Sequence, residues 1–591
     1  MGSLSDIRTY LIKNNNIDKC YEIIEYLNKP TEDKLQKLIE FKEICNFGID
    51  ATSCLEDCLK IFATSPEEYR AKFIFAQNII WTEIVKCAEI VMENTQKMKK
   101  QQVLNYGNDY LKAVEQVEKL CRIYAETQAR ISELEDILGV DRYLDKISAD
   151  DLSVLNCLLE EQAEVLNSIT SEYRYKFQTQ WNLTQIRNIL FHKLVTPDFE
   201  NQICSMLPGM QKRSIVFVVD GFGMCQYLWN KSMWKGNKFL TFKENIFSWL
   251  SKEHCMTELV LGSGHVSDTA SGLGQIFSGY SGAETGIIAS KLSKNGTLYE
   301  TKKVSSSSFD GVFNISMNSL PKTFDSLGYK SDVFYCSRYD ENVSGFSKYL
   351  FNGANVISVT PSERVFSLIK DEIIEKQDWN LKFVYITNID NSGHTVGAFS
   401  KFEKYEHQKM NTLFKNFLIE LAMDAPELFD GKTSIMLTAD HGMAESAKKM
   451  ISRFDIKNVL EHIGIFNATL IENNRAMLVY GICQSVMETC VLKLVEYFKN
   501  KGITVDISCR GTNAYKKLFG DGDKADIIRP DIVLRLIGNG LFYSNRYVNL
   551  HLLHYGGHGG YSTVESFVPL LDITLNPILL DKIKKRFLDR M

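Results

Sequence analysis

The stretch "SIVFVVDG" (residues 214–221) joins an apolar run rich in β-branched residues to an aspartate and a glycine. Five similar runs follow, with helical or glycine-rich segments between them. Strands that alternate with helices in this way predict an α/β fold, with a predominantly parallel sheet sandwiched by helices. The further runs are "TELVLGSG" (257–264), "SDVFYCS" (331–337), "FVYITNID" (383–390), "SIMLTADHG" (434–442) and "DIVLRLIG" (531–538).

The first third of the chain has a different composition. Residues 1–200 hold only four of the 36 glycines and contain two runs with helical spacing of apolar residues, at 67–98 and 109–138. We therefore predict a helical N-terminal domain over residues 1–200, a bundle or a helical hairpin. Two interpretations of its apolar stripe stay open: it is buried within its own bundle, or it binds a protein partner or a second copy of the chain.

The predicted α/β domain covers residues 210–591. This domain is long enough to contain segments between the motifs that form neither predicted strands nor predicted metal ligands. Cap or lid insertions are expected at roughly 291–380 and 446–530, where they would select the leaving group of a substrate.

Composition restricts the function classes. The 591-residue chain, with 45% hydrophobic and 24% charged residues, can bury large cores. A formal net charge of -5 gives no global basic field, which disfavours nucleic acid as a partner. The fourteen cysteines form no CxxC pair, and the N-terminus lacks the features of a secretory signal. From these two features we expect a reduced, cytoplasmic protein. No run approaches 18 apolar residues, so we expect no membrane span.

Three of the apolar runs end in an aspartate, namely Asp220, Asp390 and Asp440. In parallel sheets, ligands bind beyond the carboxyl ends of the strands, where these side chains would lie. His441 directly follows Asp440, and His394 comes four residues after Asp390. Because carboxylate and imidazole together suit zinc or manganese, the pattern predicts a metal site at this edge of the sheet.

A last histidine, His558, lies between glycines in "HYGGHGGYSTVESFVPLL" (554–571). Glycines on both sides let the backbone approach a site closely. His558 is therefore a third candidate imidazole ligand, and the nearby His554 competes with it for that role.

The stretch "SDTASGLGQIFSGYS" (267–281) is also glycine-rich. Its second half has the spacing of a phosphate-binding P-loop, but Tyr280 occupies the position of the lysine that such a loop needs. The hydroxyl groups of Ser267, Thr269 and Ser271 are then the groups through which this stretch can take part in chemistry.

Taken in order, "VVDGFG", Thr269 before a small-residue helix, "DNSGH", "DHG" and "HGG" resemble the alkaline phosphatase superfamily, specifically its nucleotide pyrophosphatase/phosphodiesterase-like branch. The resemblance covers about residues 210–575. It implies that Thr269 is the nucleophile and forms a covalent phospho- or nucleotidyl-threonine. It also implies two divalent metal ions, zinc first and manganese as the alternative. One ion would be held by Asp220, Asp440, His441 and the Thr269 oxygen, the other by Asp390, His394 and His558.

The chain departs from this branch at one position. The branch has an asparagine 21 residues after the nucleophile, where this chain has Ser290. We expect Ser290, together with Gly221, to contact the substrate. No arginine occurs between Arg213 and Arg338, which leaves a monoester dianion without a cationic clamp local in sequence and favours diesters.

These features predict a two-metal phosphodiesterase or nucleotide pyrophosphatase that acts on a small phosphate ester or a nucleotide. A phosphomonoesterase is the alternative within enzymes. The segments "HGGYSTVESFVPLL" and "VYITNID" also resemble the PglZ domain of phage-defence systems. That resemblance implies a defence or interaction protein whose helical N-terminal domain binds a partner, with hydrolysis secondary or absent. Ser562 and Glu565 match its HGGxSxxE pattern, and their roles stay open.

Overall fold

The structure is a computed structural model, and the residues that it describes all lie in one compact unit, residues 109–591. The predicted helical run at 67–98 lies outside the described residues. The described ranges are 109–133, 171–196, 201–232, 245–294, 297–301, 319–336, 349–376, 378–445, 450–512, 515–516, 519, 529–538, 540–543 and 556–588.

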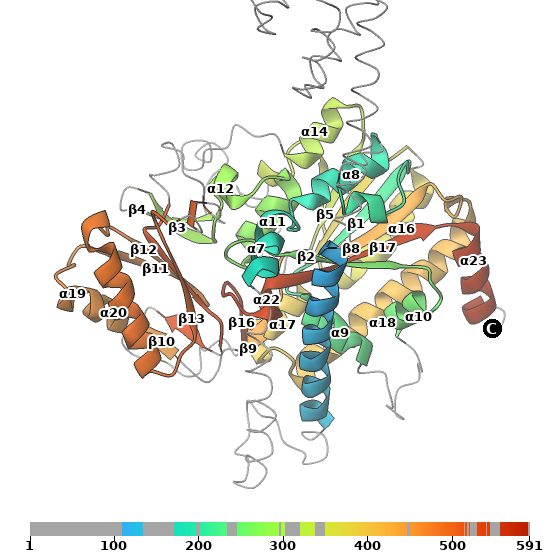
Figure 1. The fold of residues 1–591 in the computed structure, drawn as a ribbon. Helices are drawn as coiled ribbons and strands as arrows, with labels where there is room; N and C mark the ends of the chain where they lie inside the picture. The colour runs from blue at the N-terminus through green and yellow to red at the C-terminus, as the bar shows by residue number, and fades with distance from the viewer. Residues whose placement is uncertain are drawn as a thin grey trace, which may run out of the picture. The chain divides into compact units, whose positions relative to one another are not determined.

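A seven-stranded sheet forms the centre of this unit (Figure 1). One strand, β17, runs antiparallel to both of its neighbours, and the other neighbouring pairs are parallel. The predicted α/β fold with a predominantly parallel sheet is confirmed. The strand order is β2 (Thr257–Gly262), β17 (Phe567–Leu575), β8 (Thr433–Thr438), β1 (Arg213–Val219), β7 (Leu381–Ile386), β5 (Ser331–Tyr335) and β6 (Asn355–Ser358).

Helices cover both faces of the sheet, which explains why the central strands read as continuous apolar runs. Phe217 of β1 packs against Phe366 of α16 (Val365–Glu375) and Phe414 of α18 (Lys401–Asp424). Phe383 of β7 points to the opposite face, because its neighbour Val384 pairs with Phe217. There Phe383 meets Phe277 of α11 (Thr269–Ser278), with ring centroids 4.8 Å apart.

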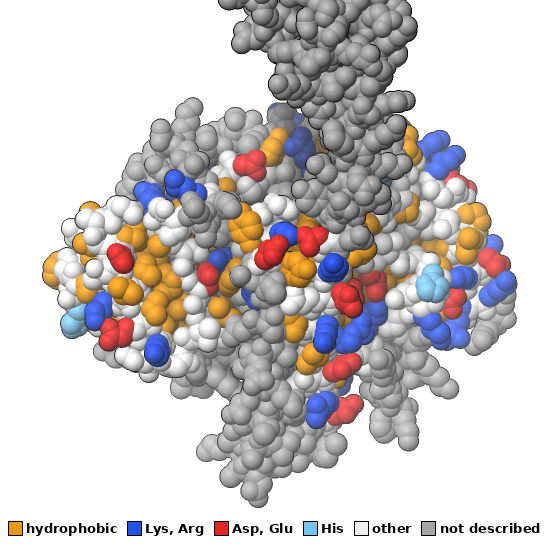
Figure 2. Space-filling view, viewed as in Figure 1, with side chains coloured by type: hydrophobic (Ala, Val, Ile, Leu, Met, Phe, Trp, Pro, Cys, Tyr) orange, Lys and Arg blue, Asp and Glu red, His pale blue; other side chains and the backbone are white. Residues whose placement is uncertain are grey.

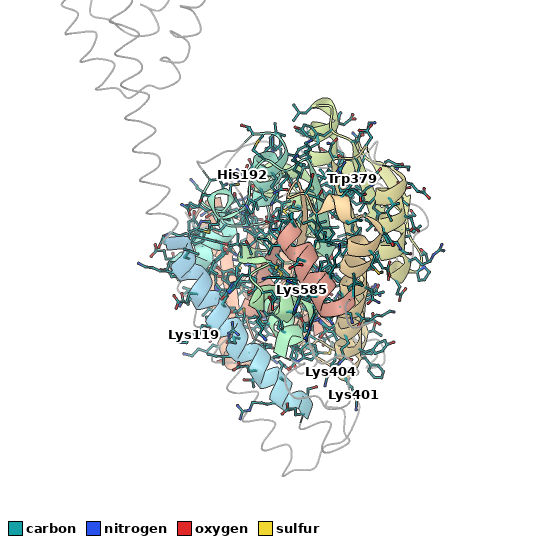
Figure 3. All side chains as sticks on the ribbon, turned by 90° about the vertical axis from the view of Figure 1, so that its right-hand side faces the viewer. Lys119, His192, Trp379, Lys401, Lys404 and Lys585 are labelled. Carbon is teal, nitrogen blue, oxygen red and sulfur yellow. The ribbon has the colours of Figure 1, made fainter. Side chains whose placement is uncertain are left out.

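A helix over residues 109–133 contacts the same unit (Figure 3, where Lys119 lies on this helix). The Tyr110 hydroxyl donates to the Val260 carbonyl in β2 at 2.8 Å, and the Tyr124 ring lies 5.3 Å from that of Phe399. The apolar stripe predicted within 109–138 is thus buried against the α/β core in its described part. The domain boundary near residue 200 and a partner for the N-terminal residues stay predictions.

Residues 450–543 contain a second sheet of four antiparallel strands with a hydrophobic core of its own (Figure 1). The run "DIVLRLIG" forms β14 in this sheet, so its predicted place in the parallel sheet is wrong. Both kinds of strand are buried and apolar, and the sequence pattern does not say which sheet a strand joins. The elements are α19 (Arg453–His462), β11 (Thr469–Asn473), β12 (Ala476–Tyr480), α20 (Met487–Asn500), β13 (Val505–Cys509), β14 (Ile532–Leu536) and β15 (Leu541–Tyr543).

The two ranges predicted as caps differ in structure. Within 291–380, β5 and β6 are strands of the central sheet, whereas β3 (Lys291–Lys294) and β4 (Thr297–Glu300) form a separate hairpin. The described helices and strands within 446–530 pack into the unit built on the four-stranded sheet, which we call the inserted domain (residues 450–543). Whether the inserted domain acts as a lid stays a prediction.

The surface agrees with the small net charge. Acidic and basic side chains are interspersed over the described part of the face in Figure 2. Among the described residues, no helix is both long enough and apolar enough to cross a membrane.

Candidate active site

The carboxyl ends of three neighbouring strands bring the predicted aspartates together. Asp220 directly follows β1, Asp440 follows β8, and Asp390 lies in α17 (Asn388–Val396) after β7. Gly221 sits between them at φ +74°, and a Cβ there would lie 3.0 Å from the Asp390 Cα. Its N–H donates to Oδ1 of Asp440 at 3.3 Å. Gly221 thus allows the three segments to approach closely, and its contact with substrate stays a prediction.

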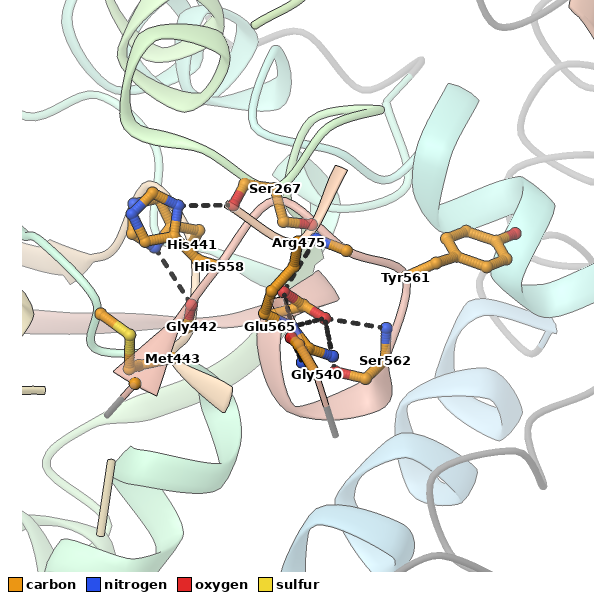
Figure 4. A network of polar contacts seen from close by, with 12 residues as sticks. Ser267, His441, Gly442, Met443, Arg475, Gly540, His558, Tyr561, Ser562 and Glu565 are labelled. Carbon is orange, nitrogen blue, oxygen red and sulfur yellow. Dashed lines mark hydrogen bonds and ion pairs between the residues drawn. The ribbon is translucent and has the colours of Figure 1, made fainter. Parts of the chain in front are cut away.

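The six predicted side-chain ligands form two triplets. Candidate ligand atoms lie within 4.8 Å of one another in each triplet. The rings of His441 and His558 stack with centroids 3.8 Å apart, so the triplets adjoin (Figure 4). These are the groups that the family resemblance implies; His554 lies outside the described residues. The first triplet is Asp220, Asp440 and His441, and the second is Asp390, His394 and His558.

All three histidines present the same nitrogen to the site. A carbonyl oxygen only accepts hydrogen bonds, so an Nδ1 that faces one carries the proton, and the Nε2 lone pair is left for the site. Figure 4 shows this arrangement for His441 and His558. Nδ1 lies 3.1 Å from the Gly442 oxygen in His441, 3.0 Å from the Gly556 oxygen in His394 and 3.2 Å from the Ser267 oxygen in His558.

The second triplet places two such lone pairs against each other. Nε2 of His394 lies 3.0 Å from Nε2 of His558. Oδ1 of Asp390 is 3.4 Å from the former and 3.6 Å from the latter. Two lone pairs at this separation repel unless a proton or a metal cation lies between them. Beside a carboxylate, this donor set suits a divalent cation.

The carboxylates also fit metal ions. Oδ1 of Asp390 and Oδ2 of Asp440 are buried and accept no hydrogen bond from any of the residues that the structure describes. Burial raises the pKa of the Asp440 carboxyl by more than the neighbouring His441 lowers it, and Asp390 raises it further. Negative charge is therefore poorly compensated at this edge of the sheet, as expected where cations bind.

Thr269 is the first residue of α11, the small-residue helix expected to follow it. Asp268 is the N-cap and accepts the Ser271 N–H at 2.9 Å. The Thr269 hydroxyl lies 3.2 Å from Nε2 of His441, next to the first triplet. Gly272 makes this closeness feasible, because a Cβ at this residue would lie 2.5 Å from the Asp440 carbonyl oxygen.

Ser290 also reaches the start of α11. Its N–H donates to Oδ2 of Asp268 at 2.6 Å, and its carbonyl oxygen accepts from Thr301. The residue is half-buried. Its position beside the residue that caps the Thr269 helix suits a contact with substrate, which stays a prediction.

Tyr385 is a residue at the site that the sequence reasoning missed. Its hydroxyl donates to Oδ2 of Asp220 from the end of β7. Burial raises the pKa of Tyr385, so the phenol keeps its proton. Within the run "FVYITNID", a tyrosine looks like any other buried strand residue, and no spacing signal marks it.

We expect Tyr385→Phe to weaken metal binding at the first triplet by about 10- to 100-fold, the usual cost of losing a hydrogen bond to a metal ligand. Titration of the metal-free protein with Mn²⁺ measures the effect. Tyr405→Phe is the control, because Tyr405 is 62% exposed. Equal affinity in Tyr385→Phe and in the unmodified protein would contradict the predicted role.

A comparison with known protein families gives a match over part of this chain. A family described as type I phosphodiesterase / nucleotide pyrophosphatase matches residues 244–485. This range includes Thr269, Asp390, His394, Asp440 and His441. No curated protein matches the chain.

Two solved structures are similar at low identity. Murine ectonucleotide pyrophosphatase / phosphodiesterase 5 has a TM-score of 0.44 and 16% identity, over 61% of this chain and 87% of its own. Phosphonoacetate hydrolase from Sinorhizobium meliloti 1021 also has a TM-score of 0.44 and 16% identity, over 62% of this chain and 91% of its own. The matched residues make up 242 of the chain's 591 residues, and together with the motifs they support a resemblance to the nucleotide pyrophosphatase/phosphodiesterase branch of the alkaline phosphatase superfamily and a phosphoester hydrolase activity.

Proposed function

We propose that the protein is a two-metal phosphodiesterase or nucleotide pyrophosphatase that uses Thr269 as its nucleophile. The observation that carries the proposal is the 3.0 Å separation of Nε2 in His394 from Nε2 in His558, beside the buried Asp390 carboxylate. Asp390, His394 and His558 would hold one ion. Asp220, Asp440 and His441, with the Thr269 oxygen, would hold the other. Zinc suits this mixture of imidazole and carboxylate best, and manganese is the alternative.

The reaction proceeds in two steps. Divalent cations, when bound, favour the deprotonated hydroxyl and neutralise phosphate charge. The Thr269 oxygen forms a bond to phosphorus while the bond to the leaving alkoxide breaks. Water then displaces the threonine oxygen from phosphorus and restores the hydroxyl. The first turn of α11 adds positive potential where the phosphate charge gathers.

The substrate is a small phosphate ester or a nucleotide, which the description of the matching family supports. A cavity of about 530 Å³ borders α17, the helix that carries Asp390 and His394. Its walls combine polar groups, such as those of Thr387 and Asn391, with the aromatic rings of Phe402 and Tyr405. Neither Asp390 nor His394 lines this cavity, which opens on another face of α17 than the one that carries these two residues.

We expect the protein to hydrolyse bis(p-nitrophenyl) phosphate at least about tenfold faster than p-nitrophenyl phosphate, with manganese or zinc added. A monoester dianion benefits from an extra cationic hydrogen-bond donor, worth about 1.5–3 kcal/mol. The fold brings Arg475 and Arg535 near the His558 loop, but they are engaged with Glu565 and Asp506. A screen of monoesters and diesters measures the ratio, and a faster monoester would favour the phosphomonoesterase alternative.

The PglZ-like interaction protein is the second candidate, supported by the HGGxSxxE pattern. It predicts no turnover in the same screen and a protein that copurifies through residues 1–200. Turnover that depends on Thr269 would contradict it.

A further inference from the structure

The inserted domain contacts the loop that carries His558. The contact is made by the turn between β11 and β12. In that turn, the N–H of Arg475 donates to the His558 carbonyl oxygen at 3.1 Å. In the facing loop, Gly559 comes directly after His558 and has a φ of +104°. A Cβ on Gly559 would lie 2.7 Å from the carbonyl oxygen of Asn473 in β11. The turn and the loop are therefore packed backbone against backbone.

The Arg475 side chain anchors this contact (Figure 4). It is 1% exposed, and its Nε lies 3.1 Å from both carboxylate oxygens of Glu565. Nη2 donates to Oε1 of Glu565 at 3.1 Å and to the Gly538 carbonyl at 3.0 Å, and Nη1 donates to the Gly540 carbonyl at 2.9 Å. All three guanidinium nitrogens are thus engaged, and the planar fork fixes their directions.

Glu565 connects Arg475 to both histidine loops. Its side chain accepts the Gly560 N–H at 2.9 Å and the Ser562 hydroxyl at 2.7 Å, which holds the loop after His558. Its carbonyl oxygen accepts the Gly442 N–H at 3.1 Å, next to His441. Ser562 and Glu565 also form the capping box of α22 (Thr563–Ser566). These contacts give a structural role to Ser562 and Glu565 of the HGGxSxxE pattern, neither of which is a candidate metal ligand or nucleophile.

We propose that Arg475 is a positioning residue: through its pair with Glu565, the inserted domain sets the place of the His558 imidazole relative to His394. This inference rests on the proposed function, because it concerns the metal triplet that contains His558. A merely structural pair stabilises the fold without favouring either triplet, whereas a positioning pair acts on the second triplet first.

The test uses the full chain with Arg475→Lys, which keeps the charge and loses the bidentate fork. Metal-free protein is titrated with Mn²⁺ to give one binding step for each triplet. The step that is lost in His558→Ala is assigned to the second triplet, and the remaining step to the first. We expect Arg475→Lys to bind about 10- to 100-fold more weakly at the second triplet and unchanged at the first. Arg453→Lys is the matched control in the same domain, since Arg453 is partly exposed and pairs with Glu472 at 3.5 Å.

Glu565→Gln keeps the capping box through its one amide oxygen but removes the charge pair and the acceptor of the Gly560 N–H, so it tests the same link by a second change. It should show the same selective loss if Arg475→Lys does not fold. Wild-type affinity at both steps with a lower unfolding temperature would overturn the proposal, and so would an equal loss at both steps. An unmodified protein that binds no Mn²⁺ would contradict the proposed function instead, so the two failures are distinguishable.

Discussion

Replacing Thr269 with alanine should lower the rate of phosphodiester hydrolysis by about 10⁴-fold or more, because it removes the oxygen that attacks phosphorus. The side chains of both triplets remain in this variant, so uptake of metal ions should persist. Steady-state turnover of bis(p-nitrophenyl) phosphate and the metal content of the same sample give both quantities.

Two further variants delimit this result. Thr269→Ser keeps a hydroxyl and should retain measurable turnover. Ser271→Ala is a neighbouring control, because the buried Ser271 hydroxyl has no hydrogen-bond partner within the described ranges. A fully active Thr269→Ala would overturn the assignment of the nucleophile while leaving the metal triplets in place.

Asp440→Asn should remove one metal ion per chain and lower turnover by about 10³-fold. The substitution keeps the size of the side chain and removes the buried charge that faces His441. Without that charge, a cation in the first triplet loses much of its stabilisation. Asp390→Asn should do the same in the second triplet.

The number of metal ions that each variant retains after gel filtration is compared with that of a control variant at an exposed aspartate. Asp378→Asn serves as that control, since the Asp378 side chain is 84% exposed and pairs with Lys330. If Asp440→Asn and Asp390→Asn both retained two ions, the assignment of the ligands would be wrong.

The parallel sheet and the aspartates at its edge could be predicted because they follow from local features. Strands in a parallel sheet buried on both faces are apolar throughout, and their carboxyl ends meet at one edge. Asp220, Asp390 and Asp440 each come within a few residues of a strand end, so the sequence places them together without long-range information.

What could not be predicted depends on contacts between distant segments. Arg475 and Glu565 are 90 residues apart and come from different domains of the fold. Tyr385 reaches Asp220 from a neighbouring strand 165 residues away. The strand β14 could not be assigned to its sheet, because a buried antiparallel strand with apolar residues on both faces has the same pattern as a parallel one.

The central claim is that metal ions held by the two triplets drive diester hydrolysis. It is tested most directly by measuring metal content and turnover of bis(p-nitrophenyl) phosphate on one preparation, before chelation, after chelation and after zinc or manganese is restored. We predict about two ions per chain at the start, loss of ions and turnover together, and recovery of both with the added metal. Full turnover by a protein that holds no metal would contradict the claim.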